Sequence, residues 1–315
     1  MQENVLVTGG AGFLGSHLCE ALANLGREVT ILDNLSSGAK SNIKQAKSFA
    51  KVKLVVGDCK SPNDVKRAVS KADVIYHFAA NPEVRLELSN PSTCFRENIY
   101  ATHVLLEAIR NTDAEIVVFA STSTVYGDAK TIPTAEDYGP LEPISIYGAS
   151  KLASEALITA YCHTYKKSAV ILRFANIVGP RSKHGAINDF IIKLRRDPKQ
   201  LEILGDGHQV KSYLHVTDCV DAVLRARAER VDIFNVGSED QIEITRVAEL
   251  VTEEMGLRNV KFKFTGGVDG GRGWVGDVKN MFLDTSKIKS QGWRPRYNSE
   301  ESVRLAARQI LSREQ

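Results

Sequence analysis

The chain has 315 residues, of which 43% are hydrophobic and 25% are charged, a balance that excludes wholesale disorder, a collagen-like repeat and a disulfide scaffold. The net charge is +3, from 41 basic and 38 acidic residues with no basic run, which argues against a nucleic-acid partner. Five scattered cysteines without a CxxC pair indicate no metal site, and no apolar run approaches the roughly 18 residues of a membrane span. We therefore expect a cytoplasmic protein that binds no nucleic acid, membrane or metal.

Short β-branched runs alternate with amphipathic stretches through the first half of the chain. The runs predict strands at 4–8, 28–33, 52–56, 73–78, 115–121 and 169–174. The stretches between them predict helices, among them 13–25, 63–69, 94–110 and 147–165. Near-continuous apolar strands that alternate with helices are typical of a parallel sheet covered on both faces. The predicted fold class is therefore α/β, with a doubly wound parallel sheet.

After residue 174 glycine-rich loops, such as 205–207 and 266–273, separate shorter elements. A helix predicted at 220–228 and a strand at 232–236 resume the earlier pattern, so residues from about 216 to 237 should return to the sheet. We predict a nucleotide-binding domain at 1–175 and a smaller, interleaved C-terminal lobe at 176–315 that binds the substrate. His77 and His215 lie in strand-like runs and are expected to be packed structural residues.

A glycine-rich loop directly follows the first predicted strand. Gly9, Gly12 and Gly15 have the spacing that permits a tight turn and close approach of a pyrophosphate, whose charge the next helix N-terminus favours. Asp33 closes the second strand, where a carboxylate accepts the ribose hydroxyls of adenosine and repels a 2′-phosphate. These features favour NAD over NADP. Asp58 follows the third strand and is expected near the adenine, with a plain turn residue as the alternative.

Tyr147 and Lys151 are one helical turn apart, so both project from the same face of a predicted helix. A nearby ammonium group lowers a tyrosine pKa from about 10 by roughly 1–3 units, which makes the phenolate a general base near neutral pH. The YxxxK spacing alone occurs in many helices. Its weight comes from the hydroxyl-rich segment 121–127 at the end of the fifth strand. Ligands bind at the carboxyl ends of such strands, and a hydroxyl there can share a substrate oxygen with Tyr147.

These motifs together resemble the extended short-chain dehydrogenase/reductase family, specifically its NAD-dependent nucleotide-sugar epimerases and dehydratases. The resemblance rests on segments in family order: TGGAGFLGSHL (8–18), DNLSSG (33–38), HFAA (77–80), STSTVYG (121–127), YGASK (147–151), RFANIVGPR (173–181), DGHQVKSYLHVTD (206–218) and GWRP (292–295). It implies a Rossmann fold, NAD as cofactor and a UDP-sugar as substrate. It also implies a homodimer through the helices that match residues 91–110 and 150–165.

The resemblance implies a role for each matching residue. Tyr147 would be the base, Lys151 would lower its pKa and bind the nicotinamide ribose, and Thr122 would be a second hydroxyl on the substrate. The implied cofactor-binding residues are Gly9, Gly12, Phe13, Leu14, Asp33, Asn34, Ser36, Ser37, Gly38, Asp58, Cys59, Phe78, Ala79, Ala80, Asn98, Ser121, Tyr147, Lys151 and Ala175. The implied substrate-binding residues are Thr122, Tyr147, Arg85, Asn176, Ala186, Ile187, Glu202, Ile203, Leu204, Lys211, Arg272, Asp277 and Met281.

Ser123 and Thr124 distinguish reactions within the family. The 4,6-dehydratases carry an Asp-Glu pair there, as acid and base for the loss of water. A hydroxyl does not transfer protons near neutral pH as a carboxyl does, so dehydration is disfavoured. The pattern is most like that of the UDP-glucose 4-epimerases, which implies transient oxidation at C4 of UDP-glucose or UDP-galactose by tightly bound NAD, with Tyr147 as the base.

The chain departs from the family pattern at its cations. Lys211 replaces a phosphate-binding arginine with a point charge. Trp274 replaces a second arginine, three residues before Asp277; Arg272 could still reach the diphosphate or could be a solvated loop residue. Met281 lies at the gate of the sugar pocket. Because methionine is flexible, UDP-N-acetylhexosamines stay among the alternative substrates. The alternatives are UDP-glucuronate 4-epimerase, UDP-glucuronate decarboxylase, a threonine-type dehydrogenase that releases NADH in each turnover, and a non-enzymatic NAD-sensing protein.

Overall fold

The computed structural model describes residues 3–49, 51–82 and 90–313. The chain forms two compact units: Met1–Thr122, Ala149–Arg173 and Val223–Phe234 make up the first, and Ser123–Gly148, Phe174–Ala222 and Asn235–Gln315 the second. The segment 123–148, which the sequence analysis assigned to the nucleotide-binding domain, belongs to the second unit. It is hydrogen-bonded there, since the Thr134 N–H donates to the carbonyl of Phe282 at 2.9 Å.

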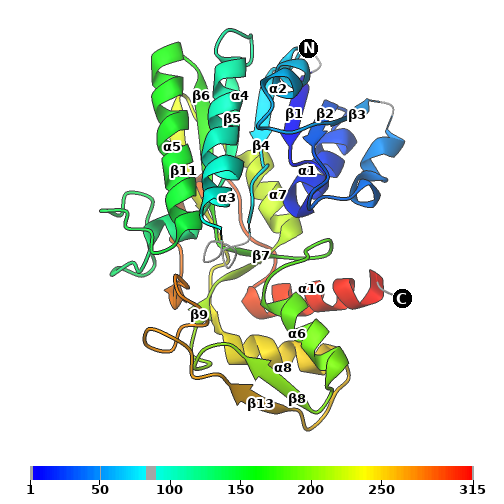
Figure 1. The fold of residues 1–315 in the computed structure, drawn as a ribbon, viewed down its shortest axis with the longest axis vertical. Helices are drawn as coiled ribbons and strands as arrows, with labels where there is room; N and C mark the ends of the chain where they lie inside the picture. Colours follow the sequence, from blue (N-terminus) through cyan, green and yellow to red (C-terminus); the bar gives the residue numbers. More distant parts are fainter. Residues whose placement is uncertain (1–2, 50, 83–89, 314–315) are drawn as a thin grey trace. The chain divides into compact units, whose positions relative to one another are not determined.

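The first unit is built on a sheet (Figure 1) of β1 (Asn4–Thr8), β2 (Glu28–Asp33), β3 (Val52–Val56), β4 (Val74–His77), β5 (Ile116–Thr122), β6 (Ser168–Phe174) and β11 (Val231–Val236). The strand order is β11-β6-β5-β4-β1-β2-β3. In parallel register, Val7 lies between Ile31 of β2 and Tyr76 of β4. The order reverses between β1 and β4, as in dinucleotide-binding sheets. The predicted fold class is confirmed.

Helices cover this sheet: α1 (Phe13–Asn24), α2 (Pro62–Val69), α4 (Ala101–Ile109) and α5 (Ile146–Tyr165). A further helix, α7 (Val216–Arg225), runs from residues of the second unit into residues of the first. Val65 of α2, Leu105 of α4 and Ile158 of α5 share one core cluster with Leu6 of β1. The residues on either side of Leu6 are also buried, and alternation along a strand points them to the opposite face. Apolar side chains therefore cover both faces, as near-continuous apolar strands predict. The homodimer that the family resemblance implies stays a prediction.

Two predicted helices differ from the structure. The helix predicted at 94–110 is divided into α3 (Ser92–Cys94), a π-helical turn (Phe95–Tyr100) and α4. The helix predicted at 220–228 is α7, which begins at Val216 because β10 (Tyr213–His215) leads directly into it.

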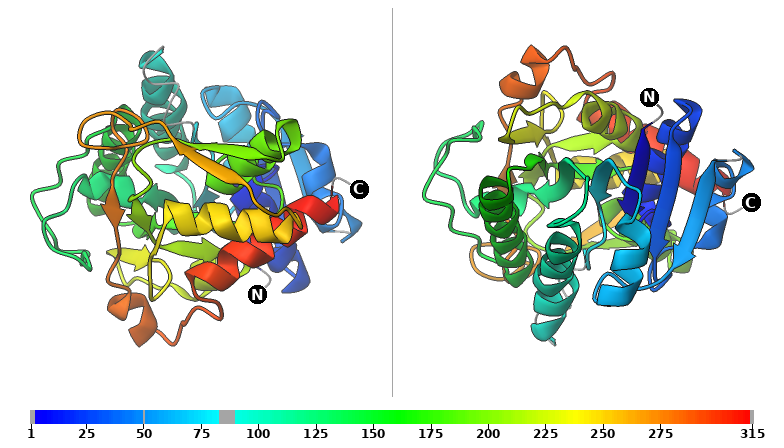
Figure 2. Two further views of the ribbon diagram at one scale, coloured as in Figure 1. Left: turned by 90° about the horizontal axis from the view of Figure 1, so that it is seen from below. Right: turned by 90° about the horizontal axis from the view of Figure 1, so that it is seen from above.

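The second unit contains short strands and several helices. Its strands are β7 (Asn176–Val178), β8 (Gln200–Ile203), β9 (Val210–Lys211), β10, β12 (Ile242–Glu243), β13 (Lys261–Phe264) and β14 (Asn280–Met281), in the sheets β10-β7, β12-β9-β14 and β13-β8. Its helices are α6 (Ala186–Arg196), α8 (Ile244–Glu254), α9 (Ser286–Ser290) and α10 (Ser299–Arg313). Phe190 of α6, Leu250 of α8 and Ala306 of α10 share one core, and α8 and α10 lie side by side (Figure 2).

The two strand histidines are packed structural residues, as predicted. His77 is buried in β4, with its ring nitrogens 2.8 Å from Thr8 Oγ1 and 3.0 Å from Thr102 Oγ1. His215 is buried in β10, and its Nε2 lies 2.9 Å from Gln309 Oε1. Of the helices in the described part of the chain, none is long and apolar enough to cross a membrane.

Candidate active site

The loop between β1 and α1 forms a cradle of bare backbone. Gly9 has a φ of +70°, and a Cβ there would lie 2.7 Å from the Ala79 nitrogen after β4. A Cβ on Gly15 would lie 2.2 Å from the Gly9 carbonyl oxygen. The first turn of α1, with Phe13 and Leu14, has no side-chain cap and no acidic residue. Because helix N-termini attract phosphate, this cradle fits the pyrophosphate of a dinucleotide.

Asp33, at the end of β2, is buried beside this cradle. Its two oxygens accept hydrogen bonds from the backbone nitrogens of Ala11 and Leu35, both at 2.8 Å. These bonds fix the orientation of the carboxylate, and each oxygen keeps further acceptor capacity for a ribose hydroxyl. The carboxylate therefore fits an unphosphorylated adenosine ribose, as NAD requires.

The ends of β2 and β3 are tied together by side chains predicted to bind adenosine. Asn34 Nδ2 donates to Asp58 Oδ2 at 3.3 Å, and Asn34 Oδ1 accepts from the Ser36 nitrogen at 3.0 Å. Gly38 packs on the cradle, because a Cβ there would lie 2.9 Å from the Ala11 carbonyl carbon. Burial raises the pKa of the Cys59 thiol to about 12. Cys59 is therefore an inert thiol, consistent with contact through its backbone alone.

Asn98 lies in the π-helical turn that interrupts the predicted helix. Its Oδ1 accepts from the Asn81 nitrogen at 2.9 Å, and its Nδ2 donates to Ser150 Oγ at 2.8 Å. The buried amide thus holds the loop after β4, which contains residues 78–80, to the start of the α5 segment in this unit. Such turns are frequent at functional sites. Asn98 thus fixes the loop whose residues 78–80 are predicted to flank the cofactor.

Lys151 is the most deeply buried ammonium group among the predicted site residues, at 3% exposure. It lies in α5, four residues after Tyr147. Its Nζ donates to the Ala120 carbonyl at 2.8 Å and lies 4.8 Å from the Phe119 ring centroid. Burial lowers the pKa of Lys151 to about 8, and Glu155 acts in the opposite direction. The ammonium is thus still charged at neutral pH, but its pKa lies close to neutral pH.

Thr122 and Ser121 end β5 and point to opposite faces of the sheet. The Ser121 hydroxyl donates to Oε1 of the buried Glu155. Ser121 was predicted to contact the cofactor, but its proton donor is directed into the protein interior, because a carboxylate is the stronger acceptor there. The adjacent hydroxyls of Ser123 and Thr124 leave this strand end without the carboxyl pair of the dehydratases.

The predicted diphosphate cations of the second unit both have carboxylate partners. Lys211 Nζ lies 2.5 Å from Asp277 Oδ1 and 5.3 Å from the Trp274 ring centroid. Arg272 forms a two-bond pair with Asp128 at 2.7 and 3.0 Å, and it donates to the Asp277 carbonyl at 2.6 Å. Two cations and two carboxylates therefore form one neutral cluster.

The remaining substrate candidates differ in what they present. Ala186 and Ile187 begin α6, whose first turn has no side-chain cap. Met281 pairs with Lys211 across β14 and β9, so the predicted gate and cation are register partners. The Ile203 side chain is fully buried in the core of the second unit, because β8 buries alternate residues. Any contact of Ile203 with the substrate is therefore restricted to its backbone.

Other candidates stand at strand ends or outside the described chain. Glu202 is exposed and lies 3.5 Å from Lys193 Nζ, and Leu204 follows β8. Ala175 donates from its nitrogen to the Val236 carbonyl at 2.9 Å, and Asn176 Nδ2 donates to the Ser212 carbonyl at 3.1 Å. Ser37 follows Ser36 in an exposed turn. Arg85 lies outside the described residues.

Three charged residues near the candidate site were not predicted from the sequence: Glu155, its partner Arg173, and Asp128, the partner of Arg272. For Arg173 the sequence carried a signal, because a charged residue inside the apolar strand 168–174 must have a partner. Glu155 had a weaker one, since it lies one turn beyond Lys151. Asp128 had none in the sequence. In the described chain, no group of three or more His, Cys, Asp or Glu could hold a metal ion.

Known proteins match nearly the whole chain. The model of the "NAD dependent epimerase/dehydratase family" matches residues 5–237. A "Putative UDP-glucose 4-epimerase" of Methanocaldococcus jannaschii is 32% identical over 95% of this chain and 96% of its own length. A crystal structure of a UDP-galactose 4-epimerase is 42% identical with a TM-score of 0.87, over 99% of both chains. A Thermus thermophilus UDP-glucose 4-epimerase in complex with NAD is 32% identical with a TM-score of 0.84, over 96% and 97%.

Further matches act on other nucleotide sugars. They include 4-epimerases of UDP-N-acetylglucosamine and UDP-glucuronic acid, and dTDP-D-glucose 4,6-dehydratases. Similarity therefore does not determine which sugar this chain binds. It does determine the family, because the family model covers most of the chain, including the glycine cradle and the Tyr147–Lys151 helix. The chain belongs to the NAD-dependent epimerase/dehydratase family.

Proposed function

We propose that the protein is a UDP-glucose/UDP-galactose 4-epimerase that keeps its NAD bound through turnover. The observation that carries this proposal is the buried Lys151, one helical turn after Tyr147, on a chain whose fifth strand ends in hydroxyl residues. The hydroxyls of Ser123 and Thr124 favour epimerisation over dehydration, because dehydration needs a carboxyl acid and base at that point.

The residues of this chain perform the proton transfers and the positioning. Tyr147, as phenolate, removes the proton of the sugar 4-hydroxyl and later returns it. Lys151 keeps the phenolate form favourable through its charge, and Thr122 holds the 4-oxygen by a hydrogen bond. NAD, when bound, would supply the reversible hydride chemistry that oxidises and reduces C4. The glycine cradle and Asp33 hold the cofactor between turnovers.

The anionic diphosphate must bind close to an already neutral cluster. Lys211 and Arg272 are the cations for it, and their partners Asp277 and Asp128 share their charge. We infer that Lys211 contributes a point charge and that the backbone N–H groups at the start of α6, at Ala186 and Ile187, contribute further donors. This arrangement replaces the arginine pairs of the family pattern with weaker, shared contacts.

Tyr147→Phe tests the assignment, together with a panel of UDP-sugars supplied without added NAD. The wild type should interconvert UDP-glucose and UDP-galactose, and Tyr147→Phe should lose about 10²–10⁴-fold in rate because the base is gone. Chromatography of the products measures both. Tyr165→Phe is the matched control, since Tyr165 is an exposed tyrosine of the same helix.

Specific outcomes would contradict the proposal. A Tyr147→Phe variant that keeps more than about a tenth of the wild-type rate would exclude Tyr147 as the base. Interconversion only of UDP-N-acetylhexosamines or of UDP-glucuronate and its 4-epimer would move the assignment to those substrates. Release of carbon dioxide from UDP-glucuronate would identify a decarboxylase, and accumulation of NADH with excess NAD would identify a dehydrogenase.

A further inference from the structure

A buried ion pair lies directly beside the Lys151 segment. Glu155 and Arg173 are 3% and 2% exposed. Arg173 Nη2 donates to Glu155 Oε2 at 2.7 Å, and Arg173 Nε donates to the two carboxylate oxygens at 3.1 and 3.3 Å. Ser121 adds a hydroxyl donor to Oε1. One carboxylate thus connects α5, β6 and the end of β5.

Such a pair needs an explanation other than stability. Removing two charges from water costs several kcal/mol per ion, and well-packed apolar residues often serve as well. The interior here also holds a second cation, the Lys151 ammonium, one helical turn before Glu155. Two cations and one anion therefore lie in a space with little water, where Glu155 acts on Lys151 through its charge.

The groups around Lys151 come from several elements. Glu155 lies on its own helix, Cys94 on α3, His77 on β4 and the Phe119 ring on β5. Burial lowers the pKa of His77 to about 3, so His77 is neutral, and Cys94 is a buried thiol. In the described chain, Glu155 is the carboxylate that acts on Lys151.

We propose that Glu155, held by Arg173, is a positioning residue for the reaction: its carboxylate keeps the buried Lys151 ammonium charged and, through Ser121, fixes the strand end that carries Thr122. This inference rests on the proposed function only for the catalytic role of Lys151. Because the Glu155 carboxylate is bound by Arg173 and Ser121 inside the first unit, we assign it a role through Lys151 and not on the substrate. Its charge opposes the effect of burial, which alone would neutralise the lysine near working pH.

The sign of the effect follows from the charges. Glu155→Gln removes the anion and leaves Arg173 and Lys151, two like charges, in one interior. The pKa of Lys151 should then fall, and a neutral Lys151 no longer favours the Tyr147 phenolate. Activity should therefore be lost from the alkaline side at a lower pH than in the wild type, while the KM for the sugar nucleotide should change little.

The experiment follows Lys151 directly, by NMR of protein labelled with ¹⁵N at the lysine side chains. The Lys151 resonance is assigned by its absence in Lys151→Met. Glu155→Gln should lower the titration midpoint of Lys151 by about one pH unit or more, tenfold in the equilibrium constant, and the alkaline limb of kcat should move with it. Glu155→Asp keeps the charge and should restore most of the midpoint.

Controls separate this role from a merely structural one. Glu254→Gln is the matched variant, because Glu254 is also a glutamate paired with arginine but belongs to the second unit. The Lys151 midpoint in Glu254→Gln should equal that of the wild type. If Glu155→Gln does not fold, the Glu155→Leu/Arg173→Leu double variant removes the pair without leaving a buried charge. The Lys151 midpoint should then still fall, but by less than in Glu155→Gln, because the Arg173 charge is also gone.

An unchanged Lys151 midpoint in a folded Glu155→Gln protein would overturn the proposal, as would a Glu155→Asp shift as large as that of Glu155→Gln. The NMR midpoint needs no turnover. A wild type that interconverts no UDP-sugar would therefore remove the proposed function while the effect of Glu155 on Lys151 was still measured.

Discussion

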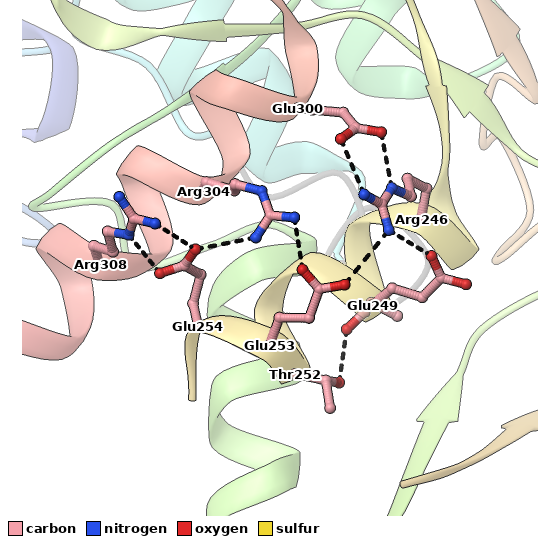
Figure 3. A network of polar contacts seen from close by, with 9 residues as sticks. Arg246, Glu249, Thr252, Glu253, Glu254, Glu300, Arg304 and Arg308 are labelled. Atoms are coloured by element: carbon pink, nitrogen blue, oxygen red, sulfur yellow. Dashed lines mark hydrogen bonds and ion pairs between the residues drawn. The ribbon is translucent and has the colours of Figure 1, made fainter. Parts of the chain in front are cut away.

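The two units each contain a network of arginines and glutamates, and the networks differ in their access to water. In the first unit Arg173 and Glu155 have side chains 2% and 4% exposed. In the second, Arg246, Arg304 and Arg308 connect α8 and α10 through glutamates of both helices (Figure 3). The side chains of these arginines are 33%, 31% and 65% exposed.

Burial therefore decides whether a charge pair only aligns two helices or also acts on neighbouring charged groups. Between α8 and α10, Arg246 meets three glutamates, Arg304 meets two and Arg308 meets one. The helices therefore gain alternative contacts that water and salt screen. Such pairs fix how two helices align but affect little beyond themselves. Around Glu155 no solvent screens the charge, so the pair acts on neighbouring groups such as Lys151. Chemically identical partners therefore serve packing in one unit and electrostatics in the other.

The largest expected difference is in stability. Arg173→Met leaves the Glu155 charge buried without its partner and should lower the free energy of unfolding by about 3–5 kcal/mol. Arg304→Met is the matched substitution in the exposed network and should cost about 1 kcal/mol or less. Urea denaturation of both variants measures this. Equal losses would show that burial does not separate the two networks.

A second, smaller effect tests whether the interior of the first unit disfavours charge in general. Burial, with the nearby Lys151, lowers the pKa of His77 to about 3, against about 6.5 in an unfolded chain. The unfolded state then takes up a proton that the folded state does not, so stability is lost as pH falls below 6.5. Between pH 6.5 and 5 the loss from His77 should be about 2 kcal/mol.

His77→Gln removes this titration. Burial also lowers the pKa of His215, so acid should still destabilise the variant, but with a shallower slope than the wild type. Denaturation at several pH values from 7 to 5 gives the two slopes. Identical slopes would mean that His77 is protonated in the folded protein, and the low polarity inferred around it would be wrong.

The smallest effect concerns salt. Raising the ionic strength from about 0.1 to 1 M shortens the screening length from about 10 to 3 Å. The stability difference between wild type and Arg304→Met should therefore shrink, by a few tenths of a kcal/mol. The difference between wild type and Arg173→Met should stay constant, because salt does not enter that interior. A shrinking Arg173 difference would show that the pair is hydrated.

Much of the first unit could be predicted because its signals are local. The strands at 4–8, 28–33 and 52–56 have the predicted bounds, since each is a short apolar run between turn residues. The π-helical turn around Asn98 could not be predicted, because it lengthens one turn in a pattern that otherwise stays helical. The grouping of segment 123–148 with the second unit could not be predicted, because its partners, such as Phe282, are far away in the sequence.

The candidate site likewise contains residues with a local sequence signal and residues whose partners are distant in the sequence. The glycine spacing, Asp33 and the Tyr147–Lys151 pair are visible in the sequence, since each function depends on residues within one loop or helical turn. The partners of Arg272 are not, because Asp128 is 144 residues away. Ile203 shows a different limit: the resemblance implies that it binds the substrate, but only the structure shows that the alternation of β8 buries its side chain in the core.

The sequence by itself determined the fold class, the cofactor loop and the helix that carries the proposed base, because strand periodicity, glycine freedom and helical spacing act between near neighbours. Only the tertiary structure decided which charges lie in water and which do not. Arg173 meets Glu155 because β6 lies next to β5 in the sheet and α5 packs over it. That placement is a property of the whole sheet, and it turns an ordinary ion pair into the environment of Lys151.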